Sequence, residues 1–485
     1  MAESLRSQTI KGVGWTFGGS IASYGITFVV GIVLARLLSP AEYGLIGIVM
    51  VFVAVFDGII DSGFSNALIR KKNATDADNN TMFITNLVIS LAMFFVMCVS
   101  APAIAQFFKE EQLTSLTRVM SVYLIINAFC LIQRTLLTKS LDFKTQTKCN
   151  VLSSLISGVI GIGMALLGYG VWSLVGQQLS RIFFNTLFLW LFNKWRPAWS
   201  FSWQSFRTLF SFGWKLMVSG IINSIWGQIY QIVIGKCYNP TTLGYYTKAR
   251  EYVDVVSKNM TSVIQKVSYP TLSIIQDDNE RLKNGYRRII KVSALTVFIL
   301  VFGMAACAKQ LILVLIGEQW LPCVPMMQLV CFSMAVYPLH AINLNMLQVQ
   351  GRSDLFLKLE IVKILIGTLP VLAGIFLNIY WMLILGFITG GCIGFWLNSY
   401  YSGKFIGYST IQQIRDILPS LGVSFSIAIP VFAMSFLSIN AFILLPIQLM
   451  IGGLLGYVVL EKTQLEEYQE MKQIAISLVN RITKK

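Results

Sequence analysis

Apolar stretches, each about 20 residues long, follow one another along almost the whole chain, and they constrain its fold more than any other feature. Hydrophobic residues make up 55% of the 485 residues, and charged residues only 12%. Because a bilayer interior offers backbone groups no water, such segments cross it as α-helices. The sequence therefore predicts an all-α integral membrane protein with about fourteen transmembrane helices.

Two segments about 200 residues apart resemble each other. Residues Ile32–Gly44 and Ile232–Gly244 carry a basic residue, a proline and a glycine in the same register. Looser echoes follow, at 136–143 and 347–354, and at 169–172 and 378–381. Corresponding helices have the same membrane orientation, so the halves are expected to be related by an axis along the membrane normal. The repeat predicts a transporter whose site between two halves opens to either side as they rock.

The chain is expected to form two pseudo-symmetric six-helix lobes, a connecting segment and additional helices at its C-terminal end. The predicted spans, with boundaries good to a few residues, lie at 12–36, 42–68, 82–107, 115–137, 149–167, 172–193, 211–236, 243–275, 289–316, 323–349, 357–377, 381–402, 417–438 and 442–460. The predicted domains are an N-terminal lobe at 1–193, an amphipathic cytoplasmic bridge at 194–210, a C-terminal lobe at 211–402, two extra helices at 403–460 and a cytoplasmic amphipathic tail at 461–485.

The basic residues are distributed unevenly between the two sides of the predicted membrane. With the N-terminus inside, about 29 of the 38 Lys and Arg residues fall in or beside cytoplasmic segments. This asymmetry predicts that both termini are cytoplasmic, and it accounts for the net charge of +16 without nucleic acid. The eight cysteines form no CxxC pair, and no phosphate loop, nucleophile elbow or zinc spacing occurs. We therefore expect no metal, no cofactor and no enzymatic activity.

Ionisable residues inside the spans are the first candidates for a functional site, because a charge in hydrocarbon costs at least about 2.5–3.5 kcal/mol. The eighth span is richest in them, with Lys248, Arg250, Glu251, Asp254, Lys258 and Lys266 on one side of a helix. One interpretation is an internally paired ladder at i, i+4 spacing that only holds this helix in place. The other, which we favour because the stripe keeps a net positive charge, is the lining of a water-filled cavity.

Three further cations stand in apolar surroundings. Arg118 lies in the fourth span and Arg181 in the sixth, and Lys215 opens the seventh. A guanidinium suits phosphate oxygens in a bidentate geometry, although Arg118 could instead snorkel to the outer interface. The hypothesis is a basic cavity for a phosphate-bearing ligand, with the binding residues Arg118, Arg181, Lys215, Lys248, Arg250 and Lys258.

Acidic residues and the single histidine form a second group of candidates. Asp57 and Asp61 lie one helical turn apart on the second span, where a cation or proton would relieve their repulsion, although Asp61 could cap its helix. His340 could relay a proton or simply be hydrogen-bonded. The candidates for ion coupling or cavity polarity are Asp57, Asp61, Glu251, Asp254 and His340. Arg36 and Lys236, at matched outer helix ends, are expected to neutralise helix C-terminal carbonyls.

The segments Leu34–Leu45 and Asp61–Ile69 resemble the bacterial polysaccharide-export proteins, the Wzx-type oligosaccharide flippases of the MATE-like superfamily. Gly168–Val175 and Leu243–Tyr246 look like further landmarks of the branch that exports exopolysaccharides. The resemblance covers nearly the whole chain. It implies two six-helix lobes around a central cavity, often with two added helices, and it carries over no catalytic residue.

The resemblance implies a substrate and a location. An oligosaccharide on an undecaprenyl pyrophosphate carrier would move from the inner to the outer leaflet of the bacterial cytoplasmic membrane, with the pyrophosphate in the basic cavity. The expected partners are this lipid-linked glycan, membrane lipids, and a polysaccharide polymerase with its chain-length regulator. One alternative is a cation-coupled drug or metabolite antiporter, which Asp57 and Asp61 favour and the excess of cations disfavours. The other is a membrane polysaccharide polymerase or ligase, which the short outer loops disfavour.

Overall fold

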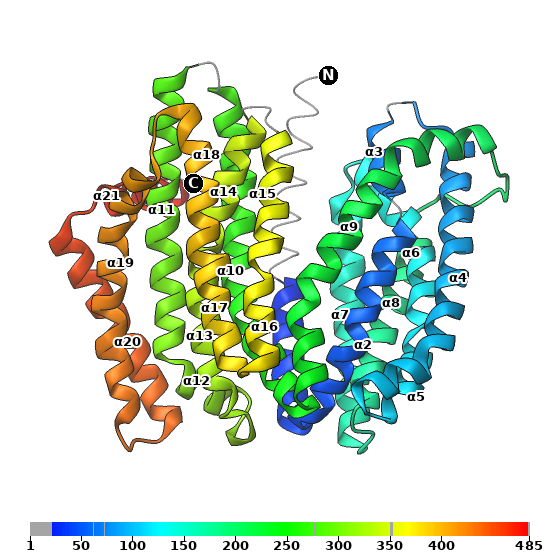
Figure 1. The fold of residues 1–485 in the computed structure, drawn as a ribbon, viewed down its shortest axis with the longest axis horizontal. Coiled ribbons are helices and arrows are strands. Elements are labelled where there is room, and N and C mark those ends of the chain that lie inside the picture. Colours follow the sequence, from blue (N-terminus) through cyan, green and yellow to red (C-terminus); the bar gives the residue numbers. More distant parts are fainter. Residues whose placement is uncertain (1–21, 62, 72, 276–277, 350–352, 484–485) are drawn as a thin grey trace. The chain divides into compact units, whose positions relative to one another are not determined.

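The computed structural model describes residues 22–61, 63–71, 73–275, 278–349 and 353–483 (Figure 1). Over this part of the chain every regular element is a helix, which confirms the all-α prediction. By their internal contacts the residues divide into two compact units, Met1–Gly244 and Tyr245–Lys485. The lobe boundaries predicted at 193 and 211 stay a prediction.

The first unit consists of long helices joined by short turns. A helix over Ala22–Leu37 is followed by α2 (Pro40–Asp61), α3 (Phe64–Arg70), α4 (Asp76–Phe108), α5 (Gln112–Met120), α6 (Val122–Lys139), α7 (Phe143–Leu166), α8 (Trp172–Phe192) and α9 (Trp203–Cys237). The helix pair α7 and α8 packs side by side, α6 packs against α4 and α8, and α9 packs against α2, α3 and α4.

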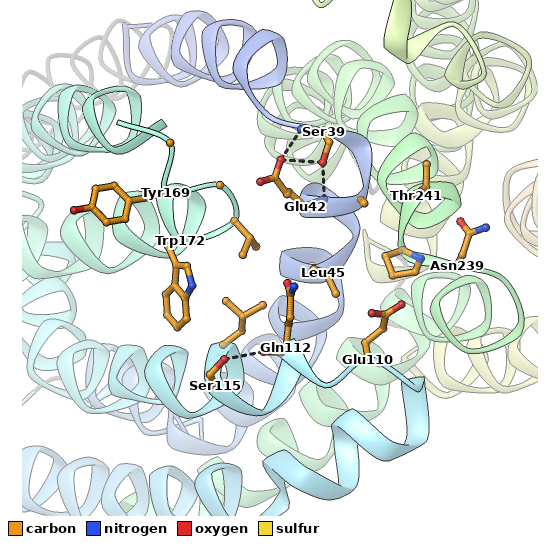
Figure 2. Close-up of a pocket in the computed structure, with 16 residues that line it drawn as sticks. Ser39, Glu42, Leu45, Glu110, Gln112, Ser115, Tyr169, Trp172, Asn239 and Thr241 are labelled. Atoms are coloured by element: carbon orange, nitrogen blue, oxygen red, sulfur yellow. Dashed lines mark hydrogen bonds between the residues drawn. The ribbon is translucent and has the colours of Figure 1, made fainter. Parts of the chain in front are cut away.

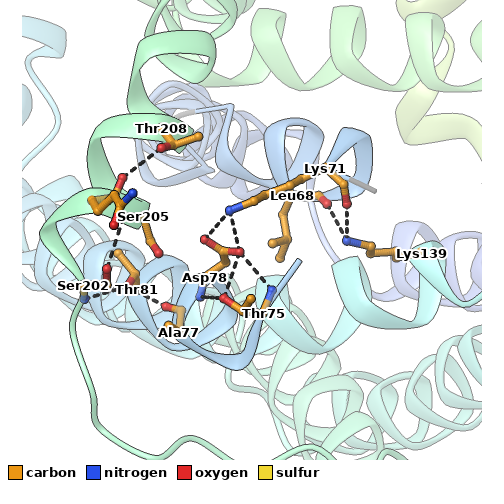
Figure 3. Close-up of polar contacts among 11 residues, drawn as sticks. Leu68, Lys71, Thr75, Ala77, Asp78, Thr81, Lys139, Ser202, Ser205 and Thr208 are labelled. Atoms are coloured by element: carbon orange, nitrogen blue, oxygen red, sulfur yellow. Dashed lines mark hydrogen bonds and ion pairs between the residues drawn. The ribbon is translucent and has the colours of Figure 1, made fainter. Parts of the chain in front are cut away.

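Polar contacts hold the helices of this unit together at one end (Figure 3). The helix α4 begins with a capping box, in which Thr75 Oγ1 accepts from Asp78 N and the Asp78 carboxylate accepts from Thr75 N at 2.9 Å. The same carboxylate, fully buried, pairs with Lys71 Nζ at 2.7 Å. Lys139 Nζ donates to the carbonyls of Leu68 at 2.9 Å and Lys71 at 2.7 Å, satisfying the end of α3.

The segment before α9 is extended and bound to α4. Ala198 N donates to Asn80 Oδ1 at 3.0 Å, and Ser202 N donates to Thr81 Oγ1 at 3.0 Å. The Phe83 ring contacts the rings of Trp195 and Trp199 at centroid distances of 6.1 and 5.7 Å. The helix α9 therefore begins inside the predicted bridge, at Trp203, where Ser202 caps it.

The helix α10 (Pro240–Ile274) begins in the first unit and continues into the second. The second unit then contains α11 (Asn279–Ala306), α12 (Ala308–Leu315), η1 (Glu318–Trp320), α13 (Cys323–Ala335), α14 (Tyr337–Val349), α15 (Ser353–Ile366), α16 (Thr368–Phe376), α17 (Ile379–Gly386), the π-helical η2 (Phe387–Ile393), α18 (Gly394–Ile406), α19 (Thr410–Ala433), η3 (Met434–Phe436), α20 (Ala441–Thr463) and α21 (Glu466–Thr483). The helix α11 packs against α13, α14, α19 and α21.

The predicted amphipathic tail is a helix, α21, that ion pairs attach to α11. Arg288 Nε contacts Glu470 Oε2 at 2.5 Å, and Lys291 Nζ contacts Glu466 Oε2 at 2.7 Å. The hydrogen bond from Lys291 holds the pKa of the Glu466 carboxyl below its ordinary value. The tail is thus part of the second unit and not a free extension.

Eleven helices in the described residues are long and apolar enough to cross a membrane, and a shorter one covers 22–37. These correspond to all predicted spans except the first, the sixth and the eighth. The sixth and eighth are nevertheless helices, α8 and α10, of 21 and 35 residues, and they carry many polar side chains. The protein is therefore a multi-pass membrane protein, and the count of fourteen stays a prediction.

The predicted topology can be tested with single cysteines, after Cys98, Cys237 and Cys392, the three that are not buried, are replaced by serine. We expect a membrane-impermeant maleimide to label Lys109→Cys and Glu318→Cys in intact cells. Labelling of Lys144→Cys and Lys404→Cys should require permeabilised cells, because the positive-inside rule puts these loops in the cytoplasm. The reverse pattern at both pairs of sites would contradict the assigned orientation.

Candidate functional site

A cluster of polar and charged residues lies at membrane depth in the first unit. We call it the α6 cluster and define it as Asp57 on α2, Tyr123, Asn127 and Arg134 on α6, and Arg181 on α8. Asn127 Nδ2 donates to the Asp57 carboxylate, and Arg134 lies within electrostatic range of Asp57 and Tyr123. Arg181 lies within electrostatic range of Tyr123 and Arg134. Two guanidinium groups and one carboxylate thus share one region between three helices.

Arg134 is not among the predicted binding residues, although it lies inside the predicted fourth span at 115–137. Its side chain is exposed, and Arg134 Nη2 donates to Cys130 Sγ at 3.5 Å, one turn back along α6. The guanidinium therefore points away from the near end of the helix and toward the middle of the span. A cation at this depth needs a partner or water, and the α6 cluster supplies the Asp57 carboxylate within electrostatic range.

The other predicted residues of this unit lie outside the cluster or at its edge. Asp61 is within electrostatic range of Asp57, and it accepts a hydrogen bond from Ser65 Oγ on the following helix. Arg118, on α5, and Lys215, on α9, are both exposed. Among the described residues of the unit, neither of these cations makes a hydrogen bond or ion pair with the α6 cluster. Their role in binding stays a prediction.

The second unit carries the charged stripe of α10. Lys248, only 2% exposed, pairs with Glu251 at 2.8 Å. Asp254 pairs with Lys258 at 2.5 Å and with Arg250 at 3.6 Å. Three cations and two carboxylates leave one positive charge. The paired ladder is thus present, and its position along a water-filled cavity stays a prediction.

Further polar residues of the second unit lie near this stripe. Tyr337 is within electrostatic range of Asp254, Arg250 and Glu360, and Glu360 forms an ion pair with Lys363 on the same helix, α15. His340 on α14 lies 3.2 Å from Asn398 Nδ2 on α18 through its Nδ1. Glu360 and Lys363 are not among the predicted site residues. Both lie inside the predicted eleventh span, and a charge inside a span was the pattern that could have identified them.

The two repeated Pro-to-Gly segments touch each other within the first unit. A Cβ atom added to Gly44 would lie 1.8 Å from the Pro240 carbonyl oxygen, and one added to Gly244 would lie 1.9 Å from the Pro40 carbonyl oxygen. Only glycine permits so close an approach of two backbones. We call this reciprocal arrangement of Pro40, Gly44, Pro240 and Gly244 the corner contact. It gives a structural reason for the register of the sequence repeat.

Hydrogen bonds stiffen each side of the corner contact. Glu42 Oε2 accepts from Ser39 N at 2.6 Å and from Ser39 Oγ at 2.9 Å, and Asn239 Oδ1 accepts from Thr242 N at 2.8 Å. Each proline occupies the first position of its helix, where no backbone donor is needed. Lys236 Nζ donates to the Phe107 carbonyl at 2.5 Å, so it neutralises the end of α4, whereas its own helix is α9. These contacts hold the backbone of each corner in place.

A pocket of 910 Å³ opens beside the corner contact in the first unit (Figure 2). Its walls come from the two corners, the turn between α4 and α5, and the turn between α7 and α8. The lining residues are Ser39, Ala41, Glu42, Leu45, Glu110, Gln112, Ser115, Leu116, Gly168, Tyr169, Gly170, Val171, Trp172, Asn239, Pro240 and Thr241. None of these residues is cationic, which separates the pocket chemically from the α6 cluster.

Known proteins resemble the chain in sequence and fold. A family model described as "Polysaccharide biosynthesis protein" matches residues 33–325. The teichuronic acid biosynthesis protein TuaB of Bacillus subtilis is 25% identical over 82% of this chain and 83% of its own length. The lipopolysaccharide biosynthesis protein WzxC of Escherichia coli is 24% identical over 74% of each chain.

Solved structures show the same architecture. The lipid II flippase MurJ in an inward closed conformation matches with a TM-score of 0.74 at 14% identity, over 91% of this chain and 98% of that one. An inward-facing multidrug transporter of the MATE family matches with a TM-score of 0.61 at 16% identity, over 79% of this chain and 94% of that one. The expected MATE-like fold is confirmed.

The corner contact predicts a strong effect of a single methyl group. In Gly44→Ala the new Cβ atom would lie 1.8 Å from the Pro240 carbonyl oxygen, whereas real Cβ atoms essentially never come within 3.0 Å of such an atom. We expect the distance between spin labels at Ala41 and Thr241, measured by pulsed electron resonance on reconstituted protein, to increase by about 1 Å or more.

The matched control is Gly58→Ala on the same helix, where a Cβ atom would meet nothing within 4 Å. It should leave the distance distribution unchanged. A Gly44→Ala variant that is well folded and has the wild-type distance distribution would contradict the corner contact.

Proposed function

This chain belongs to the polysaccharide biosynthesis protein family, and we propose that it is a flippase for oligosaccharides linked to undecaprenyl pyrophosphate. It works in the bacterial cytoplasmic membrane with both termini in the cytoplasm, and it moves its substrate by alternating access without catalysing a reaction. Three facts support the proposal: the family match over residues 33–325, the names of the relatives, and a fold shared with a lipid II flippase.

The observation that carries the proposal is the pair of guanidinium groups, Arg134 and Arg181, in the α6 cluster. A pyrophosphate is an anion with several acceptor oxygens, and planar guanidinium groups bind such anions with paired, charge-assisted hydrogen bonds. The undecaprenyl chain would remain in lipid. Arg118, Lys215 and the α10 cations Lys248, Arg250 and Lys258 are proposed as further contacts along the path of the anion.

The corner contact supports a mechanism of alternating access. Each glycine meets the carbonyl of the other corner directly. Because glycine has no side chain that could keep contact as the two corners separate, the corner contact is either formed or broken. Two discrete arrangements are what a transporter needs in order to expose its site to one side at a time. We infer that the corner contact closes the outer side, and that separating the corners opens it. Membrane lipids, a polysaccharide polymerase and its chain-length regulator are the proposed partners.

A cation-coupled antiporter is the second candidate, and Asp57 is the observation that favours it. Its carboxylate accepts a hydrogen bond from Asn127 at membrane depth, where a proton or a metal cation could be exchanged. Arg134 within electrostatic range counts against this role, because its positive charge weakens the binding of a proton or a metal cation at Asp57. No contact in the described residues favours a polymerase or ligase.

Neutralising the guanidinium groups should impair export. We expect Arg134→Ala and Arg181→Ala to weaken the apparent affinity for the lipid-linked substrate about 10- to 100-fold, the cost of a charge-assisted hydrogen bond. Arg250→Ala and Lys258→Ala should show smaller losses, because each pairs with Asp254. Export is measured by complementation of a deletion strain and by flipping in proteoliposomes.

Arg415→Ala, at an exposed arginine outside both charged groups, is the matched control and should export normally. Normal flipping by well-inserted Arg134→Ala and Arg181→Ala variants would reject the guanidinium site. The antiporter would replace the flippase if the wild type exchanges a cationic dye for protons but does not flip the lipid-linked substrate, and if Asp57→Asn abolishes that exchange.

A further inference from the structure

The pocket beside the corner contact has a chemistry that the proposed flippase cavity does not explain. Its polar lining consists of carboxylates, amides and hydroxyl groups, and it contains two aromatic rings but no lysine or arginine. Figure 2 shows Tyr169 and Trp172 on one side, Asn239 and Thr241 on the other, and Glu42 and Glu110 around the space between them. Two carboxylates repel a phosphate, so this pocket cannot be a second site for the pyrophosphate.

The lining suits a neutral ligand that is rich in hydroxyl groups. Carboxylates and amide oxygens accept hydrogen bonds from hydroxyls, and the amide groups of Gln112 and Asn239 also donate them. The rings of Tyr169 and Trp172 offer flat apolar surfaces that pack against C–H groups. Sugars present both kinds of surface. The volume of 910 Å³ lies within the ordinary range for small-molecule sites, about 300–1,000 Å³, and a short oligosaccharide is of that size.

The pocket wall is built by backbone that only glycine allows. Gly168 and Gly170 have φ values of +81° and +54°, in the left-handed region. A Cβ atom on Gly170 would lie 2.5 Å from Glu42 Oε1, so a side chain at residue 170 would displace the Glu42 carboxylate from its present position. These two glycines present the intervening Tyr169, which is 56% exposed, and the nearby Trp172. The sequence landmark Gly168–Val175 thereby acquires a role that the proposed anion site does not give it.

We propose that this pocket is a saccharide subsite, which binds neutral sugar residues of the glycan that the proposed flippase carries. The inference rests on the proposed function for the source of the sugar. Ser39 and Ala41 belong to one corner, and Asn239, Pro240 and Thr241 to the other. A sugar that touches both corners stabilises the arrangement in which they meet, so binding in the pocket favours the corner contact.

The test uses the full-length protein in lipid nanodiscs and a cysteine in the pocket wall, Ser115→Cys, with Cys98, Cys237 and Cys392 replaced by serine. The rate of maleimide labelling is measured with maltotriose, triacetylchitotriose, inorganic pyrophosphate or sodium chloride. With a millimolar Kd, about 10 mM of a neutral trisaccharide should slow labelling about tenfold, because it occupies the pocket. Pyrophosphate and salt should have no effect. Lys309→Cys, exposed and outside the pocket, should react at one rate in all four solutions.

Two variants examine the aromatic wall, and one matched variant controls for the loss of an aromatic ring. Trp172→Ala and the exposed Tyr169→Ala should abolish the protection of Ser115→Cys by the trisaccharides. Trp381→Ala, which changes the repeat counterpart of Trp172 and lies outside the pocket, should retain it. Spin labels at Ala41 and Thr241 should report a larger fraction of the short distance when a trisaccharide is added.

Three results would overturn the saccharide subsite. The first is that neither trisaccharide slows labelling at 100 times the expected Kd. The second is that the trisaccharides protect the Trp172→Ala and Tyr169→Ala variants as well as they protect the protein with both rings. The third is that sodium chloride alone slows labelling, which would assign a cation site instead. The flipping assay separates this inference from the proposed function. If the trisaccharides give no protection but the protein flips lipid-linked glycan in a way that depends on Arg134 and Arg181, only the subsite is rejected. If the trisaccharides protect but the wild type does not flip, only the flippase is rejected.

Discussion

The energetic cost of a charge at membrane depth organises this protein. A lone ionised side chain in hydrocarbon costs at least about 2.5–3.5 kcal/mol, so each such group must find a partner or water. On α10, Asp254 pairs with Arg250 and Lys258 in consecutive turns. In the α6 cluster the carboxylate of Asp57 is held by Asn127 and lies within range of Arg134. These charged groups make one side of each helix polar.

Backbone contact at the corners imposes a second constraint. Side chains adapt to a neighbour by changing rotamer, but a carbonyl against a glycine has no such freedom. The reciprocal approach of Pro40 to Gly244 and of Pro240 to Gly44 is therefore sensitive to shifts of about one methyl group. Rigid caps at Ser39 and Asn239 keep each corner from relaxing locally. The geometry favours two separate states over a continuous deformation, as packed interfaces generally do.

Much of the fold could be predicted from local patterns, because hydropathy and helix length are properties of each segment alone. The family resemblance carried by Leu34–Leu45 is confirmed by the family match over residues 33–325. The positions of the polar groups were harder to predict. Arg118 and Arg134 lie in one predicted span, yet the span consists of two helices separated at Ser121, so helical periodicity does not carry across the break. Arg134 belongs to the α6 cluster, whereas Arg118, on α5, lies outside it.

The sequence repeat also shows what local patterns do not predict. The register of Pro40 with Pro240 and of Gly44 with Gly244 is visible in the sequence, but the contact between the two copies is not, because it depends on how distant helices cross. That crossing connects the two constraints. Each helix carries a corner at its first residues and a charged group further along, Asp57 on α2 and Asp254 on α10. At about 1.5 Å per residue these groups lie roughly 15–20 Å from the corner glycines. In the proposed alternating access, a stiff helix that pivots at its corner would carry its charged group with it, so we infer that opening the corner contact also displaces Asp57 and Asp254.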